Sequence, residues 1–131
     1  MVKALIVDDD PMTCSLLETI LQMENYQTAS ATGFGDIISL LDKEQPHILI
    51  LDFHLGSSET LGQIPLIRAH RGWQHLSIVM TSAIDRCQDC LEAGADAFIL
   101  KPFNWQDMLK TVNKLREKPK NLRRCKHSTN H

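Results

Sequence analysis

The stretch Ile48-Leu49-Ile50-Leu51-Asp52 is a continuous apolar run that ends in a carboxylate. It has the length of a strand and does not alternate with polar residues, so a strand here would be covered on both faces. Three further runs share this character, at residues 4–7, 76–80 and 97–100. Strands of this kind are typical of a parallel sheet that lies between two layers of helices.

Helical patterns with an apolar stripe fill the gaps between these runs. The first begins at Asp10-Pro11, because Asp is a good N-cap and Pro suits the first helical position. Four more are predicted at residues 37–45, 60–70, 85–93 and 104–117. Gly94 suits the C-cap of the fourth helix and Asn104 the N-cap of the fifth. A more polar stretch, residues 26–31, is predicted to be a strand at the sheet edge.

Strands and helices therefore alternate five times, which predicts an α/β fold with a parallel sheet and right-handed crossovers. We expect a five-stranded sheet in the order 2-1-3-4-5, the flavodoxin-like arrangement, with helices on both faces. The 131 residues suit a single domain, which we place at residues 2–117. Residues 118–131 hold five Lys/Arg and no acid, and we predict that they form a basic, disordered tail.

The body of the chain is acidic, since the 117 residues before this tail carry nine Lys/Arg and 16 Asp/Glu. That balance argues against nucleic-acid binding through the fold, and a short basic run is usually a solvated end or a linker. The first residues show no signal-peptide pattern, and no apolar run approaches the ~20 residues that span a bilayer. We therefore expect a cytoplasmic protein that does not contact a membrane.

Four cysteines are expected to be free thiols in such a compartment: Cys14, Cys87, Cys90 and Cys125. Cys87 and Cys90 form a C-x-x-C pattern. A thioredoxin-like motif stands at a helix start directly after a strand, whereas these two residues lie within a predicted helix. We therefore expect packing roles for both, with a redox role as the alternative.

The residues that follow the predicted strands carry the chemistry. Asp8 and Asp9 follow the first strand and Asp52 follows the third, while Thr81 and Lys101 follow the fourth and fifth. Parallel strands place their carboxyl ends at one edge of the sheet, and ligands bind at that edge in folds of this class. We therefore expect these five side chains to converge on one shallow pocket.

This set of groups has a clear chemical use. Three carboxylates would repel one another, and a hard divalent cation would relieve that repulsion. Oxygen ligands with few protein groups favour Mg²⁺, which keeps several waters and bridges to phosphate. A carboxylate beside Mg²⁺, a hydroxyl and an ammonium together describe a site for phosphoryl transfer, in which Asp52 would be the nucleophile.

The sequence resembles the receiver domain of two-component response regulators over residues 2–117. Four segments carry the resemblance: Leu5-Ile-Val-Asp-Asp-Asp-Pro11, Ile48-Leu-Ile-Leu-Asp52, Val79-Met-Thr-Ser-Ala83 and Gly94-Ala-Asp-Ala-Phe-Ile-Leu-Lys-Pro-Phe103. The last segment is the most specific, and the first is nearly as specific.

The resemblance implies a phosphoryl acceptor and a metal site. Asp52 would be the acceptor and would also contact the metal. Asp9 would bind Mg²⁺ directly, Asp8 would act through a water molecule, and the backbone carbonyl of His54 would be a further ligand.

It also implies a switch. Thr81 and Lys101 would hold phosphoryl oxygens, and the bond between Lys101 and Pro102 would be cis. On phosphorylation Thr81 would move toward the phosphoryl group and Phe98 would swing inward. This movement would remodel the face formed by the fourth helix, the fifth strand and the fifth helix.

The partners implied are a sensor histidine kinase or a histidine phosphotransfer protein as donor, and a downstream protein target that the sequence does not identify. A homodimer that depends on phosphorylation is a further possibility. Such a domain assists its own phosphorylation and dephosphorylation but is not a conventional enzyme.

The sequence leaves two other functions open. In the first, the chain is the receiver part of a DNA-binding transcription regulator, and the basic tail begins a linker. In the second, it is a small phosphatase with an aspartate nucleophile. Phosphatases of the haloacid-dehalogenase type need a second acid two residues after the nucleophile, and His54 stands there.

The run from Phe53 to Gly62 departs from the family pattern. Gly56 replaces a usual proline, and no Asp-Gly pair follows. We therefore expect a more flexible loop and an irregular start to the third helix. His54 and Ala83 occupy positions that tune dephosphorylation in the family.

Overall fold

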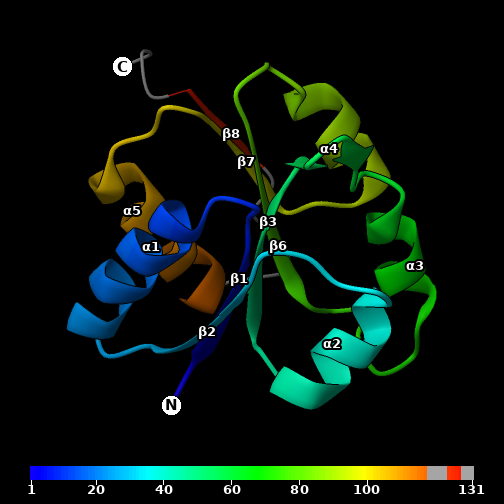
Figure 1. Ribbon diagram of the computed structural model, residues 1–131, viewed down its shortest axis with the longest axis horizontal. Helices are drawn as coiled ribbons and strands as arrows, with labels where there is room; N and C mark the ends of the chain where they lie inside the picture. The colour runs from blue at the N-terminus through cyan, green and yellow to red at the C-terminus, as the bar shows by residue number, and fades with distance from the viewer. Residues whose placement is uncertain (118–123, 128–131) are drawn as a thin grey trace.

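A parallel sheet runs through the molecule, with α1 and α5 on one face and α2, α3 and α4 on the other (Figure 1). The computed structural model describes residues 1–117 and the backbone of residues 124–127. The helices are α1 (Pro11–Met23), α2 (Ile37–Glu44), α3 (Gln63–Ala69), α4 (Cys87–Ala93) and α5 (Trp105–Glu117). The strands are β1 (Lys3–Val7), β2 (Gln27–Ala31), β3 (Ile48–Asp52), β4 (His54–Leu55), β5 (Ser58–Glu59), β6 (Ser77–Ser82), β7 (Ala97–Leu100) and β8 (Arg124–His127).

The main sheet has the order β2-β1-β3-β6-β7-β8, and all of its neighbouring strands are parallel. Its first five strands are the five that the sequence predicts, in the order 2-1-3-4-5, so the predicted flavodoxin-like fold is confirmed. The more polar strand β2 lies at the sheet edge, as expected.

The sixth strand, β8, was not predicted, since residues 124–127 belong to the tail that was expected to be disordered. Their backbone pairs with β7 in the register Ala97↔Arg124 to Leu100↔His127. The edge of β7 offers unpaired N–H and C=O groups, and an added strand satisfies them. The other residues of the tail, 118–123 and 128–131, lie outside the described part of the chain.

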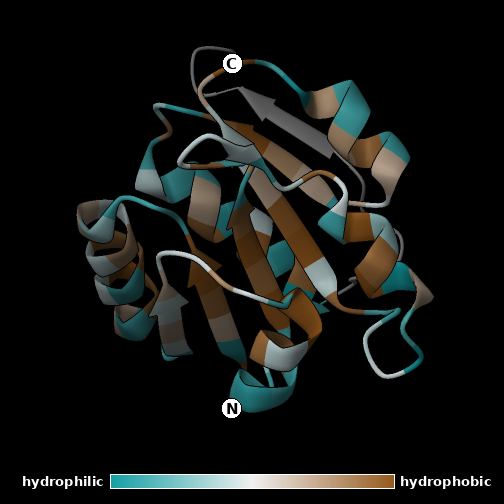
Figure 2. Cartoon of the chain, turned by 45° about the vertical axis from the view of Figure 1, so that its right-hand side comes forward, coloured by the Kyte–Doolittle hydropathy of each residue, from teal (hydrophilic) through white to brown (hydrophobic). Residues whose placement is uncertain are grey.

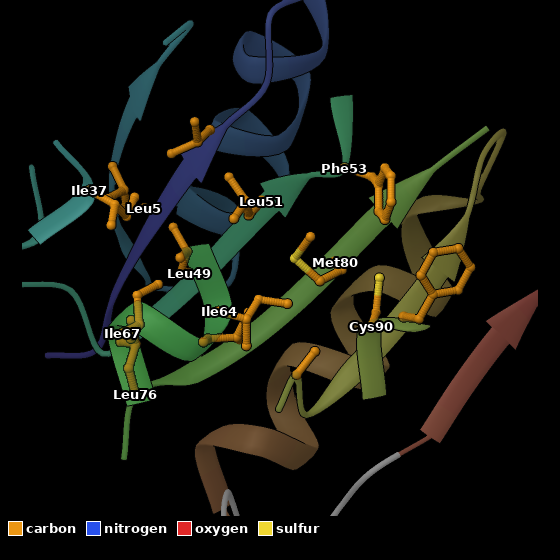
Figure 3. Close-up of a cluster of buried hydrophobic side chains, with 14 of the residues drawn as sticks. Leu5, Ile37, Leu49, Leu51, Phe53, Ile64, Ile67, Leu76, Met80 and Cys90 are labelled. Carbon is orange, nitrogen blue, oxygen red and sulfur yellow. The ribbon is translucent and has the colours of Figure 1, made fainter. Parts of the chain in front are cut away.

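Alternate residues of the central strands enter two separate cores, because successive side chains of a strand point to opposite faces. Leu5 and Leu49 pack under α2, α3 and α4, in the cluster shown in Figure 3. Ile6 and Ile50 pack under α1 and α5. Figure 2 shows the resulting hydrophobic strands between helices that carry hydrophilic residues. The continuous apolar runs of the sequence are thus explained by burial on both faces.

The helix ends follow the expected capping residues. Asp10 caps α1, and its carboxylate accepts a hydrogen bond from the Met12 N–H at 3.1 Å. Asn104 precedes α5, and its side-chain oxygen accepts from the Asp107 N–H at 2.8 Å. Gly94 ends α4 with a φ of 118°, which a residue with a side chain rarely adopts. These three caps are confirmed.

The segment between β3 and α3 differs from the prediction. It contains a short antiparallel hairpin that the sequence did not indicate, with the register His54↔Glu59 and Leu55↔Ser58. The turn begins at Gly56, whose φ of 61° is left-handed. Helix α3 then begins at Gln63, three residues later than the sequence indicated.

A guanidinium clamp holds α3 to the sheet. The Arg68 side chain donates to the backbone carbonyls of Gly94, Gln74 and Leu76. It also pairs with a carboxylate oxygen of Asp96 at 3.0 Å, and that same oxygen accepts from the Ile78 N–H. One arginine therefore fixes α3, the start of β6 and the loop between α4 and β7 relative to one another.

The expectation that all four cysteines are free thiols is wrong. Cys14 and Cys90 are free and buried, but Cys87 is disulfide-bonded. Because Cys90 is free, Cys87 and Cys90 are not bonded to each other, and the C-x-x-C pattern does not form a redox disulfide. Among the described residues, no helix is both long and apolar enough to cross a membrane.

Candidate functional site

Three carboxylates meet at the carboxyl ends of β1 and β3. Asp8, Asp9 and Asp52 each offer one oxygen, and these oxygens all lie within 4.8 Å of one another. Asp8 and Asp52 are buried, at 3% and 7% exposure, whereas Asp9 is exposed. The cluster is therefore held by the sheet on one side and open to solvent on the other.

A single lysine side chain reaches into this cluster. Lys101 directly follows β7, and its Nζ lies 2.9 Å from Asp8 Oδ2 and 3.2 Å from Asp52 Oδ2. The peptide bond from Lys101 to Pro102 is cis, as the family resemblance implies. One ammonium cannot balance three carboxylates, so the cluster keeps an excess of negative charge that a divalent cation would neutralise.

Two backbone N–H groups orient the carboxylates of Asp8 and Asp9, which follow β1. Asp8 Oδ1 accepts from the Asp10 N–H at 2.9 Å, which leaves Asp8 Oδ2 for Lys101. Asp9 Oδ2 accepts from the Gly56 N–H at 2.7 Å, a contact that joins β1 to the hairpin. The residues present therefore fit a small hard cation: the donors are all oxygens, and the carboxylates are held by the Asp10 N–H, the Gly56 N–H and Lys101 Nζ.

Burial and neighbouring charges shift the pKa values of Asp52 and Lys101. Burial raises the pKa of Asp52, the Lys101 ammonium opposes that rise, and the neighbouring Asp8 carboxylate adds to it. For Lys101, burial alone would lower the pKa, but the hydrogen bond and charge of Asp8 and the charge of Asp52 outweigh it, so the pKa is raised. Lys101 therefore stays a cation, while the carboxylate form of Asp52 gains from additional positive charge.

Thr81 lies beside this site, and Phe98 lies in the core next to it in the sheet. Thr81 is paired with Asp52 in the register of β3 and β6, and its backbone carbonyl accepts from the Phe53 N–H at 2.8 Å. Phe98 pairs with Met80 across β6 and β7 and is completely buried in the core under α4. In this structure Phe98 thus already lies inside the fold.

His54 begins the hairpin that follows Asp52. Its side chain is half-buried, and Nε2 lies 3.7 Å from Glu59 Oε2. The centre of its ring lies 4.8 Å from the centre of the Phe53 ring. The Arg86 guanidinium lies over the same Phe53 ring, 5.5 Å from its centre. The strand ends thus bring Asp8, Asp9, Asp52 and Lys101 together, with Thr81 and the main chain of His54 directly adjacent.

Two residues of this site were not identified from the sequence: Gly56, which contacts Asp9, and Thr60, which closes the hairpin onto β3. The absence of the usual proline and Asp-Gly pair marked this segment as unusual. It did not indicate which residues would replace them, because both contacts depend on how the hairpin folds back on the sheet.

Comparison with known proteins gives the same assignment as the geometry. A family model, the response regulator receiver domain, matches residues 4–113. The chain is also similar to a CheY-like receiver domain protein from Methanospirillum hungatei, with 28% identity, a TM-score of 0.78, and 92% of this chain and 98% of that chain covered.

Two further solved structures share the fold. The chemotaxis response regulator CheY4 of Vibrio cholerae has 24% identity and a TM-score of 0.74, with 88% of this chain and 98% of that chain covered. A response regulator from Thermotoga maritima has 22% identity and a TM-score of 0.77, with 90% and 99% covered. Because the family model matches most of this chain, the chain belongs to the response regulator receiver domains of two-component systems.

Proposed function

We propose that this receiver domain is a phosphoacceptor switch that takes a phosphoryl group onto Asp52. The observation that carries the proposal is the contact of the buried Asp52 carboxylate with the Lys101 ammonium, beside the carboxylates of Asp8 and Asp9. A nucleophilic carboxylate, a fixed cation and a cluster of metal-binding oxygens are the three parts that phosphoryl transfer to an aspartate needs.

The same oxygens would hold Mg²⁺. Asp9 and Asp52 would bind it directly, Asp8 through a water molecule, and His54 through its backbone carbonyl. When bound, the metal supplies positive charge beside the transferring phosphoryl oxygens. The exposure of Asp9 supports this assignment, because a cation and its waters need an open side from which to enter.

The donor in this proposal is a phosphohistidine of a sensor histidine kinase or a histidine phosphotransfer protein. An oxygen of Asp52 attacks phosphorus while the phosphorus–nitrogen bond of the donor breaks, and the imidazole nitrogen keeps the electron pair and takes up a proton. Lys101 Nζ, already 3.2 Å from Asp52, stabilises the charge on the phosphoryl oxygens, and the Thr81 hydroxyl donates to one of them.

The output is a protein–protein contact with a downstream target or with a second phosphorylated copy. Thr81 would transmit the change to the surface near α4, β7 and α5, and Phe98, whose ring is already buried here, would keep its inward position in the phosphorylated state. Because β8 pairs with the edge of β7, a partner reaches this surface through α4 and α5 and not through the backbone of β7. In this role the domain assists its own phosphorylation and is a switch, not a metabolic enzyme, located in the cytoplasm.

Labelling with acetyl phosphate and Mg²⁺, read by intact mass, tests the proposal. The wild type is expected to gain the mass of one phosphoryl group, and Asp52→Asn is expected to gain none. Asp36→Asn is the matched control, because Asp36 is an exposed N-cap at α2 and Asn caps helices as well as Asp does. Equal labelling of the wild type and Asp52→Asn would refute the assignment of the acceptor.

A further inference from the structure

Thr60 is buried in a segment whose other polar residues are exposed. It is 3% exposed, whereas the residues at positions 56–59 are all exposed. A buried hydroxyl is expected to have a hydrogen-bond partner, since leaving it without one costs free energy. The partners of this hydroxyl therefore show what holds the segment in place.

Those partners are the main-chain carbonyls of the acceptor and its neighbour. Thr60 Oγ1 donates to the Asp52 carbonyl at 2.7 Å, and the Phe53 carbonyl lies at 3.2 Å from the same oxygen. The backbone N–H of Thr60 also donates to the Phe53 carbonyl, at 2.8 Å. One residue thus closes the whole hairpin onto the end of β3.

This closure sets the direction of the chain as it leaves Asp52. The next carbonyl along the chain is that of His54, which the proposed function assigns to the metal. The hairpin also carries Gly56, whose N–H donates to Asp9 Oδ2 at 2.7 Å. The positions of two proposed metal ligands, Asp9 and the His54 carbonyl, therefore depend on a segment that Thr60 holds in place.

We infer that Thr60 is a positioning residue for the metal and phosphoacceptor site. It touches neither the metal nor the phosphoryl group, and acts through the main chain of residues 52–54 and through the hairpin. In this segment, which has neither the proline nor the Asp-Gly pair usual in the family, Thr60 supplies the rigidity instead. The inference rests on the proposed function and deepens it.

Isothermal titration of the full chain with Mg²⁺ tests this role. Thr60→Val keeps the shape of the side chain and removes the donor, and we expect its Kd for Mg²⁺ to rise about fivefold to tenfold, as the loss of a buried hydrogen bond predicts. Thr60→Ser keeps the hydroxyl, and we expect its Kd to stay within about twofold of the wild type by the same argument.

A control separates positioning from general stability. Ile64→Val removes one buried methylene from the first turn of α3, in the hydrophobic core, and should lower the melting temperature with an unchanged Kd for Mg²⁺. If Thr60→Val does not fold, Thr60→Ala is compared with Thr60→Ser, and the same difference in Kd is expected.

Three results would overturn the inference. One is a Kd of Thr60→Val equal to that of the wild type, and another is an equal loss of Mg²⁺ affinity in Ile64→Val. In both cases labelling of the wild type at Asp52 would leave the proposed function standing. The third is a wild type that neither binds Mg²⁺ nor accepts a phosphoryl group, which would defeat the proposed function and the role of Thr60 with it.

Discussion

The ammonium of Lys101 lies 3.2 Å from a carboxylate oxygen of Asp52, although the two residues are 49 positions apart in the chain. Two parallel strands bring them together, because β3 ends at Asp52 and β7 ends one residue before Lys101. The contact also places a positive charge where a phosphoryl group on Asp52 would carry negative charge. The sheet thus supplies both the proposed acceptor and the positive charge that would support its reaction.

The first prediction concerns this lysine. Lys101→Met keeps a long side chain and removes the charge, so the rate of labelling by acetyl phosphate should fall by about 10²-fold, as for other fixed groups that stabilise transition-state charge. Initial rates from intact mass at saturating Mg²⁺ would measure the effect. Lys110→Met is the control, since Lys110 is exposed on α5. A rate for Lys101→Met within twofold of the wild type would contradict the role given to the ammonium.

The second prediction concerns metal binding and stability. Three carboxylate oxygens within 4.8 Å repel one another, so a cation that binds the folded state should raise its melting temperature. At Mg²⁺ concentrations of about ten times Kd the gain is ~1.4 kcal/mol, or a rise of roughly 3–6 °C.

Asp9→Asn should abolish most of that rise, while Asp36→Asn should keep it, and thermal unfolding by circular dichroism with and without Mg²⁺ would show both. An NaCl arm at matched ionic strength separates a divalent-cation effect from an effect of ionic strength, and excess EDTA should reverse the rise. If Mg²⁺ does not change the melting temperature of the wild type, the acidic cluster is not a metal site.

The parts of this molecule that the sequence predicts are those with a local signal. The apolar runs of β1, β3, β6 and β7 reveal buried parallel strands, and the residues directly after them are therefore placed at one edge of the sheet. The sequence predicts that Asp52 and Lys101 lie close together, because each stands at the carboxyl end of such a strand.

The parts that it does not predict depend on partners far along the chain. The strands of the hairpin have two residues each, too few to show a period, and their closure depends on the contact of Thr60 with Asp52. Helix α3 begins at Gln63 and not at Thr60: the Thr60 hydroxyl, which could cap a helix, donates to the Asp52 carbonyl, and the Thr60 carbonyl accepts from the Gln63 N–H in a turn that precedes the helix. Strand β8 was missed because its sequence is polar and its pairing depends on the open edge of β7.

The third prediction concerns the clamp formed by Arg68. Arg68→Ala removes the donors to the carbonyls of Gly94 and Leu76 and the cation beside the buried Asp96, so the free energy of unfolding should fall by about 2–4 kcal/mol. Arg68→Lys should recover only part of this loss, since an ammonium lacks the planar fork of donors that reaches several acceptors.

Urea unfolding followed by circular dichroism measures these differences. The neighbouring Arg71 is exposed, and Arg71→Ala should stay within about 0.5 kcal/mol of the wild type. An equally small change in Arg68→Ala would show that the five hydrogen bonds of Arg68 do not contribute to stability.

The fourth prediction concerns the reactivity of Cys90. Burial, with a smaller contribution from the charge of Asp89, raises the pKa of this thiol to about 12. A raised thiol pKa disfavours the thiolate, which is the form that reacts, so at pH 8.5 the thiol should remain protonated and inert. We therefore expect iodoacetamide to modify Cys90 slowly in the folded protein and rapidly in urea, as measured by mass spectrometry of peptides. Rapid alkylation of Cys90 in the native state at pH 8.5 would mean that the thiol is activated, and the redox interpretation of the C-x-x-C pattern would then have to be reopened.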